Sequence, residues 1–260
     1  MKKKIGIIIA VVCGLLAAAA LAYLIVTIVS RSKAEEDYSR LASSYASGAT
    51  ADETAAPSEE TTESLIENPI DFASLKQENS DTVGWITVPD TNVNYPVLQS
   101  WVDDNFYIDH GFDREYSFPG AIYMQLCNRP GFSDRVTVLY GHNMRDGSMF
   151  ASLHSFEDSE FFDSHESFTI YTENRRLTYR VVSAFVGDDS HIINSHNFGD
   201  DRVFEEYCLS VMNPHSMSSN VRSGVKLNNT SKLLILSTCN DSNVGRYLVV
   251  GELIASEPTR

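Results

Sequence analysis

The sequence predicts a mostly β protein, built as a closed barrel or a sandwich behind one N-terminal transmembrane helix. Short runs rich in Val, Ile, Tyr and Thr recur through the C-terminal part of the chain, with turn residues between them. Helical segments do not alternate with these runs, which disfavours a βαβ sheet. A long apolar stretch near the N-terminus predicts the transmembrane helix.

Eight runs have strand character, and they are residues 84–88, 93–98, 120–124, 135–140, 168–171, 177–186, 233–239 and 246–254. Two helices are expected in the same domain. The first is "PIDFASLKQEN", with Asp71 near its start, and the second is "DDRVFEEYCLSVM", capped by Asp200 or Asp201 and apolar on one face. The second helix lies in the long connection 187–231, and connections of that length are often functional.

Residues 5–29 are 25 residues without a charge. As a helix they would span roughly 37 Å, enough to cross a ~30 Å hydrocarbon core with some tilt. The alternative is a cleaved signal peptide with its site in residues 17–22, but the apolar run continues past that point. We expect residues 1–33 to form an uncleaved anchor, with Lys2–Lys4 holding the N-terminus in the cytoplasm.

Residues 34–69 are rich in Ser, Thr, Ala and Glu, and residues 34–67 carry nine acidic groups against Arg40. Such a composition buries little apolar surface, so a flexible acidic stalk is predicted there. Residues 70–260 are then expected to form one extracytoplasmic domain. The net charge of the chain is −15 and it has no basic patch, which argues against a nucleic-acid partner.

The stretch "LLILSTCNDSNVGRYLVV" reads as two strands around a six-residue loop. If they pair antiparallel, Cys239 and Arg246 become neighbours, with Cβ atoms about 4.5–5.5 Å apart. A guanidinium so placed stabilises a thiolate or an oxyanion on the carbonyl that the thiolate attacks. The alternative for each residue alone is a small buried thiol and a solvated cation.

A third residue, His142, strengthens the case for a site, because it follows directly after a predicted strand in "VTVLYGHNMRDGSMF". Imidazole titrates near neutral pH and suits proton transfer. The other six histidines are expected to be surface or structural residues: His110, His154, His165, His191, His196 and His215. None has metal-ligand spacing with a cysteine, so no metal site is predicted.

Leu236-Ser237-Thr238-Cys239 with a downstream arginine, together with Gly-His-Asn-Met at 141–144, resembles the sortase family of cysteine transpeptidases. The segments "GWITVPDTNVNYPVLQS" and "PGAIYM" also look like sortase strands. The Gly-His-Asn-Met pattern and the helix before the cysteine strand resemble class B. The similarity covers most of residues 70–256.

The resemblance implies an eight-stranded sortase barrel, without a cofactor, on the outer surface of a Gram-positive bacterium. It assigns catalysis to His142, Cys239 and Arg246. The thiolate would attack the Thr carbonyl of a secreted protein's C-terminal sorting signal, Asn-Pro-x-Thr-like or Leu-Pro-x-Thr-Gly-like. A peptidoglycan-precursor amine, carried on lipid II, would then resolve the thioacyl enzyme.

Further site residues follow with less support from the sequence. Ser237 and Thr238 are candidates for substrate contact, and Tyr107 and Ile108 for the peptide groove, with core packing as the alternative for the latter pair. Asp241 is a candidate auxiliary carboxylate or a solvated loop acid.

Gln125 stands where relatives often have an acid, and Cys127 and Cys208 are expected to be free thiols, although an extracellular disulfide is the alternative.

Two other functions stay open at this point. One is a pilin-polymerising sortase with a Lys nucleophile, and the other is a non-catalytic, membrane-anchored binding protein.

Overall fold

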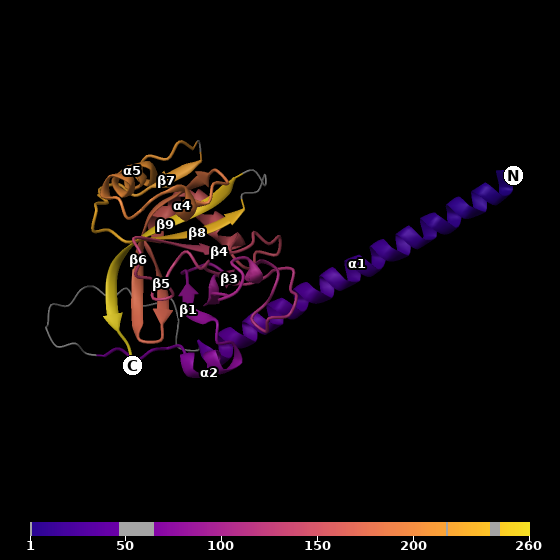
Figure 1. Cartoon of the computed structure of the whole chain (residues 1–260), viewed down its shortest axis with the longest axis horizontal. Helices are drawn as coiled ribbons and strands as arrows, with labels where there is room; N and C mark the ends of the chain where they lie inside the picture. The colour runs from indigo at the N-terminus through magenta and orange to yellow at the C-terminus, as the bar shows by residue number, and fades with distance from the viewer. Residues whose placement is uncertain (1, 47–64, 217, 240–244) are drawn as a thin grey trace.

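The computed structural model describes residues 2–46, 65–216, 218–239 and 245–260, with side chains from residue 11 onward (Figure 1). Its described part contains nine strands: β1 (Thr82–Thr87), β2 (Asn94–Leu98), β3 (Ile122–Tyr123), β4 (Val136–Tyr140), β5 (Ser167–Thr172), β6 (Arg175–Gly187), β7 (Ser219–Val221), β8 (Leu233–Cys239) and β9 (Arg246–Pro258).

Eight of these strands close into a barrel. The order is β5-β1-β2-β3-β4-β8-β9-β6, and β6 pairs with β5 to complete the ring. The predicted barrel is therefore confirmed. The ninth strand, β7, was not predicted, because its three residues are short of β-forming side chains. It pairs with β6 at Ser183–Phe185, beyond the part of β6 that β5 covers.

Side chains of the barrel strands divide between two cores, because successive residues of a strand face opposite sides. In β8, Leu234 and Leu236 belong to the barrel interior, whereas Leu233 and Ile235 belong to a second cluster outside it. This outer cluster is covered by α5 (Asp201–Met212), whose buried face consists of Phe204, Tyr207, Cys208 and Val211.

The helices within the domain are short. The two predicted ones are confirmed: α2 (Phe72–Glu78) is capped by Asp71, which accepts from the Ser74 N–H, and α5 is capped by Asp200 rather than Asp201. The remaining helical segments are η1 (Phe106–Ile108), η2 (Ala151–Glu157), α3 (Ser159–Ser164) and α4 (Ile192–Ser195).

The N-terminal helix α1 (Lys2–Tyr45) projects from the domain as a single rod (Figure 1). Its apolar part is exposed and is long and apolar enough to cross a membrane. The helix also continues well beyond the predicted anchor, so the expected stalk is wrong over residues 34–46. Ala34, Tyr38 and Leu41 lie on one face of α1 and are buried against the domain. Stalk residues 47–64 lie outside the described residues.

The described cysteines are all free thiols, which agrees with the preferred expectation for Cys127 and Cys208. Cys127 is exposed, whereas Cys208 lies on the buried face of α5. Burial raises the pKa of the Cys208 thiol to about 11, so it stays protonated at neutral pH.

Gly251 in β9 gives a direct test of the barrel packing. A Cβ at this position would lie 2.6 Å from two ring carbons of Phe168 and 2.9 Å from the Tyr179 Cβ. We expect Gly251→Ala to lower the free energy of unfolding by about 1–3 kcal/mol, the usual range for overpacking. Gly131→Ala is the matched control, since a Cβ there meets nothing within 4 Å. Equal denaturant midpoints for the two variants would contradict this packing.

Candidate active site

Strands β8 and β9 pair antiparallel with Cys239 opposite Arg246, the register expected from the sequence. The Arg246 Nη1 donates to the Cys239 Sγ at 3.6 Å. The guanidinium also approaches a carboxylate, with its Nε 3.5 Å from the Asp189 Oδ1. A cation this close to the sulfur stabilises negative charge on it and on an oxygen that develops charge beside it.

Cys239 is the last residue of β8 and continues the outward-facing series of Leu233 and Ile235. The thiol therefore lies on the outside of the barrel, at the end of the strand and half-buried. The two strands beside β8 bring the other two candidate residues toward the thiol. Strand β9 begins with Arg246, and β4 leads directly into the loop that carries His142.

His142 reaches the site through the parallel pairing of β4 with β8. Tyr140 pairs with Ser237, and the Gly141 N–H donates to the Ser237 carbonyl at 3.2 Å. The loop that carries His142 therefore leaves β4 close to the end of β8, where Cys239 lies. Gly141 is required for the close approach, because a Cβ there would lie 2.5 Å from the Ile122 Cδ1.

The imidazole of His142 is oriented by its own contacts. Its Nε2 lies 2.7 Å from the Ile108 carbonyl oxygen, and its ring is parallel to that of Phe118, with centroids 6.4 Å apart. A carbonyl oxygen only accepts, so the Nε2 carries a proton in this arrangement. The structure thus places His142 next to the thiol's strand and ties it to Ile108 rather than to Cys239.

Asn143, His154 and Glu157 form a polar chain that reaches the backbone carbonyl of Cys239. The sequence did not reveal this chain. The Asn143 amide nitrogen lies 3.1 Å from the Cys239 carbonyl and 3.1 Å from the His154 Nε2, and the His154 Nδ1 lies 2.7 Å from a Glu157 oxygen. Glu157, His154 and Asn143 thus form a continuous polar chain that ends on the backbone carbonyl of Cys239.

His154 was expected to be a surface or structural residue, because nothing local connects it to the cysteine. It sits in the 3₁₀ segment η2, its ring stacks on Tyr247 with centroids 4.6 Å apart, and its Nε2 also lies 3.2 Å from the Cys239 carbonyl. The sequence feature that could have pointed to this chain is Asn143, because it directly follows His142.

Tyr123 and Tyr140 lie near Cys239 and Arg246. Tyr123 and Tyr140 are cross-strand partners with ring centroids 5.5 Å apart. Burial raises the pKa of Tyr123 to about 12 and raises that of Tyr140 further, while the nearby Arg246 acts in the opposite direction on both. Both side chains are therefore neutral phenols at neutral pH.

Three of the residues predicted to contact substrate are buried. Ser237 and Thr238 are buried, at 2 % and 0 % exposure, so neither side chain is open to a bound peptide. Tyr107 is also a core residue, with its hydroxyl donating to Asp81 at 2.7 Å. Contact of these three residues with substrate stays a prediction, and the burial of Tyr107 agrees with its alternative, core packing.

Ile108 does lie at the site, half-exposed and with its carbonyl on His142. Asp241 lies outside the described residues. Gln125 is engaged through its Oε1, 2.8 Å from the His191 Nε2. Among residues with a described position, no group of three or more His, Cys, Asp or Glu side chains is arranged to hold a metal ion.

Known proteins with this barrel and these motifs are sortases. Residues 86–254 match the sortase domain family. Sortase B of Listeria monocytogenes is 31% identical over 187 residues, covering 71% of this chain and 74% of the relative. Sortase B of Staphylococcus aureus is 28% identical over 186 residues, covering 70% and 74%.

Solved structures agree with the sequence relatives. Sortase B from B. anthracis in complex with AAEK1 superposes with a TM-score of 0.70 at 27% identity, covering 87% of this chain and 99% of that one. Clostridium perfringens sortase B gives a TM-score of 0.64 at 32% identity, covering 70% and 99%.

The chain is a cysteine transpeptidase of the sortase family. Within that family it belongs to class B. Its substrates are proteins that carry a sorting signal, and its acceptor is an amine of the cell wall.

The Asn143–His154–Glu157 chain gives a prediction about the site. We expect His154→Ala to lower kcat/KM for peptide cleavage by roughly three- to tenfold, the equivalent of one hydrogen bond, because Asn143 and the Cys239 carbonyl lose a polar partner. The thermal midpoint reports any loss of folding. His165→Ala is the control, since His165 contacts Asp90 and Phe161 instead. Equal kcat/KM in both variants would show that His154 does not support the cysteine.

Proposed function

We propose that Cys239 is the nucleophile, His142 the acid–base residue and Arg246 the oxyanion-stabilising residue of this transpeptidase. The proposal is supported most directly by the hydrogen bond from Arg246 to the Cys239 sulfur at the end of paired strands, with the His142 loop alongside. The three groups supply a soft nucleophile, a proton carrier and a permanent cation, which together suffice for acyl transfer.

The first half-reaction transfers the acyl group to the enzyme. The Cys239 thiolate attacks the Thr carbonyl carbon of the sorting signal, and Arg246 stabilises the oxygen that becomes negative. The carbon–nitrogen bond then breaks. Protonated His142 gives its proton to the leaving amine, and a thioester joins the Thr carbonyl to Cys239.

The second half-reaction returns the enzyme to its starting state. An acceptor amine attacks the thioester carbonyl, neutral His142 takes the proton that the amine loses, and the carbon–sulfur bond breaks. The products are a new amide and the Cys239 thiolate. Arg246 serves both half-reactions, because each passes through a tetrahedral oxyanion at the same carbon.

The substrate specificity is proposed from class membership and from the site. We assign the signal to the Asn-Pro-x-Thr-like type, with Leu-Pro-x-Thr-Gly-like signals as the alternative, and the acceptor to a peptidoglycan-precursor amine carried on lipid II. Tyr140, a neutral and partly exposed phenol near Arg246, suits a polar but uncharged peptide segment, since it adds no charge of its own.

The location follows from α1. We propose that α1 crosses the membrane once with the N-terminus in the cytoplasm, which leaves the catalytic domain on the outer surface. The supporting observations are an exposed apolar helix near the N-terminus and lysines at its beginning.

The catalytic assignment predicts distinct kinetics for each substitution. We expect Cys239→Ala to abolish cleavage of fluorogenic Asn-Pro-x-Thr and Leu-Pro-x-Thr peptides, and Arg246→Ala to lower kcat by roughly 10²-fold, as for loss of one oxyanion donor. Cys127→Ala is the matched control, since it removes an exposed thiol that has no assigned role.

Cleavage that survives in Cys239→Ala would refute the assignment. A panel of amines, containing oligoglycine, diaminopimelate and a pilin Lys peptide, then identifies the acceptor. Transfer to the pilin peptide alone would replace cell-wall anchoring with pilin polymerisation.

A further inference from the structure

The part of α1 that follows its apolar run packs against residues 106–120, the segment whose Ile108 carbonyl orients the His142 imidazole. The side chains facing the domain are Arg31, Ala34, Tyr38, Leu41 and Tyr45, spaced three or four residues apart and so on one face of the helix. Leu41 is fully buried and Tyr38 is 6 % exposed. Docking therefore begins at Arg31, two residues after the apolar run ends at Val29.

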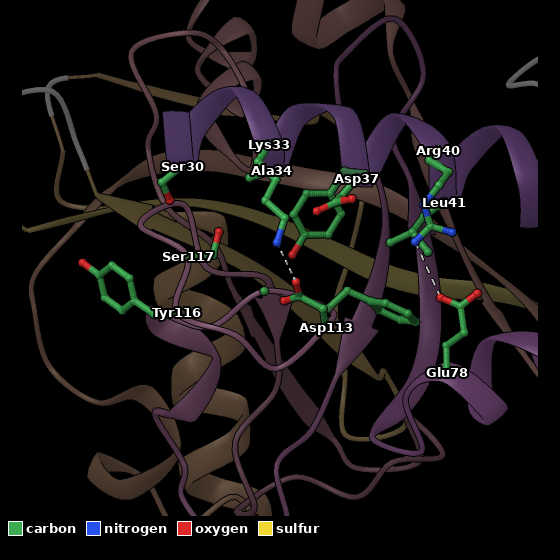
Figure 2. A pocket seen from close by; sticks show the side chains of 13 residues that line it. Ser30, Lys33, Ala34, Asp37, Arg40, Leu41, Glu78, Asp113, Tyr116 and Ser117 are labelled. Carbon is green, nitrogen blue, oxygen red and sulfur yellow. Dashed lines mark hydrogen bonds and ion pairs between the residues drawn. The ribbon is translucent and has the colours of Figure 1, made fainter. Parts of the chain in front are cut away.

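Figure 2 shows the groove between this helix and residues 111–117, with a few discrete contacts across it. Lys33 pairs with Asp113 at 3.3 Å and Arg40 with Glu78 at 3.6 Å, and both pairs are solvent-exposed. Exposed pairs of this kind contribute little to stability. The buried contacts of Tyr38 and Leu41 carry the docking instead.

Tyr38 connects the helix to the loop through its hydroxyl, which donates to the Gly120 carbonyl at 2.8 Å. Gly120 has a φ of +59°, and a Cβ there would lie 2.5 Å from the carbonyl oxygens of both Tyr107 and Ile108. The Ile108 oxygen is the one that holds the His142 Nε2. A shift of Gly120 would thus be passed directly to the acceptor that orients the imidazole.

Arg31 makes a second connection. Its guanidinium carbon lies 5.0 Å from the centre of the Phe118 ring, a cation–π distance. The same ring lies parallel to His142. The His142 imidazole is therefore flanked by Phe118 and held by Ile108. Arg31 contacts Phe118 directly, whereas Tyr38 reaches Ile108 through Gly120.

We propose that Arg31 and Tyr38 of the membrane-anchor helix are positioning residues for His142. The inference rests on the proposed role of His142 in proton transfer. The helix would then hold the domain against the membrane surface and, through residues 106–120, also fix the imidazole beside Cys239. Full catalytic efficiency would require α1 in its docked position.

The test uses the full chain in phospholipid nanodiscs, with Arg31→Gln and Tyr38→Phe combined. Tyr38→Phe removes only the hydroxyl, and Arg31→Gln replaces the cation with a shorter, neutral polar side chain. We expect kcat to fall by roughly tenfold, as for a modestly displaced catalytic group, while KM stays within about twofold. Arg40→Gln is the matched control on the same helix, because its partner Glu78 lies outside residues 106–120.

A spectroscopic measurement separates positioning from general stability. In ¹⁵N-histidine-labelled protein, the His142 resonances, assigned with His142→Gln, should shift in the double variant and stay in place in Arg40→Gln. Unchanged kcat and unchanged resonances would overturn the proposal. A raised KM at constant kcat would also overturn it, because the loop would then bind peptide without orienting His142.

The two proposals fail differently. If His142→Gln retains full activity, the assignment of His142 is wrong. If His142→Gln is inactive while the double variant matches the control, only the role of α1 is wrong. A thermal midpoint within a few degrees of the unmodified chain is required for the double variant, and Phe118→Leu provides a second disruption from the loop side.

Discussion

The site depends on the hydrogen-bonded register of β8 with the strands on either side of it. Antiparallel pairing with β9 sets Arg246 opposite Cys239, and parallel pairing with β4 brings the His142 loop to the same strand end. Because side chains alternate along a strand, a shift of one residue in either pairing would move a catalytic group to the opposite face. The two buried cores hold that register, with β8 contributing side chains to both.

Polar side chains from the loop after β4 and from η2 bind the backbone at the end of β8. Asn143 binds the Cys239 carbonyl just where β8 ends, and His154 and Glu157 hold Asn143 in turn. The backbone of Gly120 passes so close to the Ile108 carbonyl that a Cβ there would lie 2.5 Å from its oxygen, and this oxygen is the acceptor for the His142 Nε2. A transpeptidase gains from such rigidity, because in the proposed mechanism both half-reactions use His142 as proton carrier at the same carbon.

Much of this architecture could be predicted from the sequence, for identifiable reasons. The eight barrel strands have local β composition, and the Cys239–Arg246 pair lies within one hairpin, so short-range rules sufficed. The role of His154 could not be predicted, since its connection to the cysteine depends on the tertiary position of η2. Ser237, Thr238 and Tyr107 were assigned to substrate contact, whereas their burial depends on which face the barrel encloses.

The C-terminal end of α1 lies beyond the predicted end of the anchor for a different reason. The composition of residues 34–46 resembles the polar segment that follows, while the buried stripe of Ala34, Tyr38 and Leu41 becomes visible only when the helix is extended past Lys33. Composition averages over both faces of a helix, and one buried face is enough to fix it against a domain.

The central claim is that one thiol, set by this register, carries the acyl group. Intact-mass measurement followed by peptide mapping, on the full chain quenched during turnover of a sorting-signal peptide, tests it most directly. We expect a thioester adduct, with the mass of the peptide up to its Thr residue, on the fragment that contains Cys239. An adduct on Cys127, or turnover without any adduct on Cys239, would contradict it.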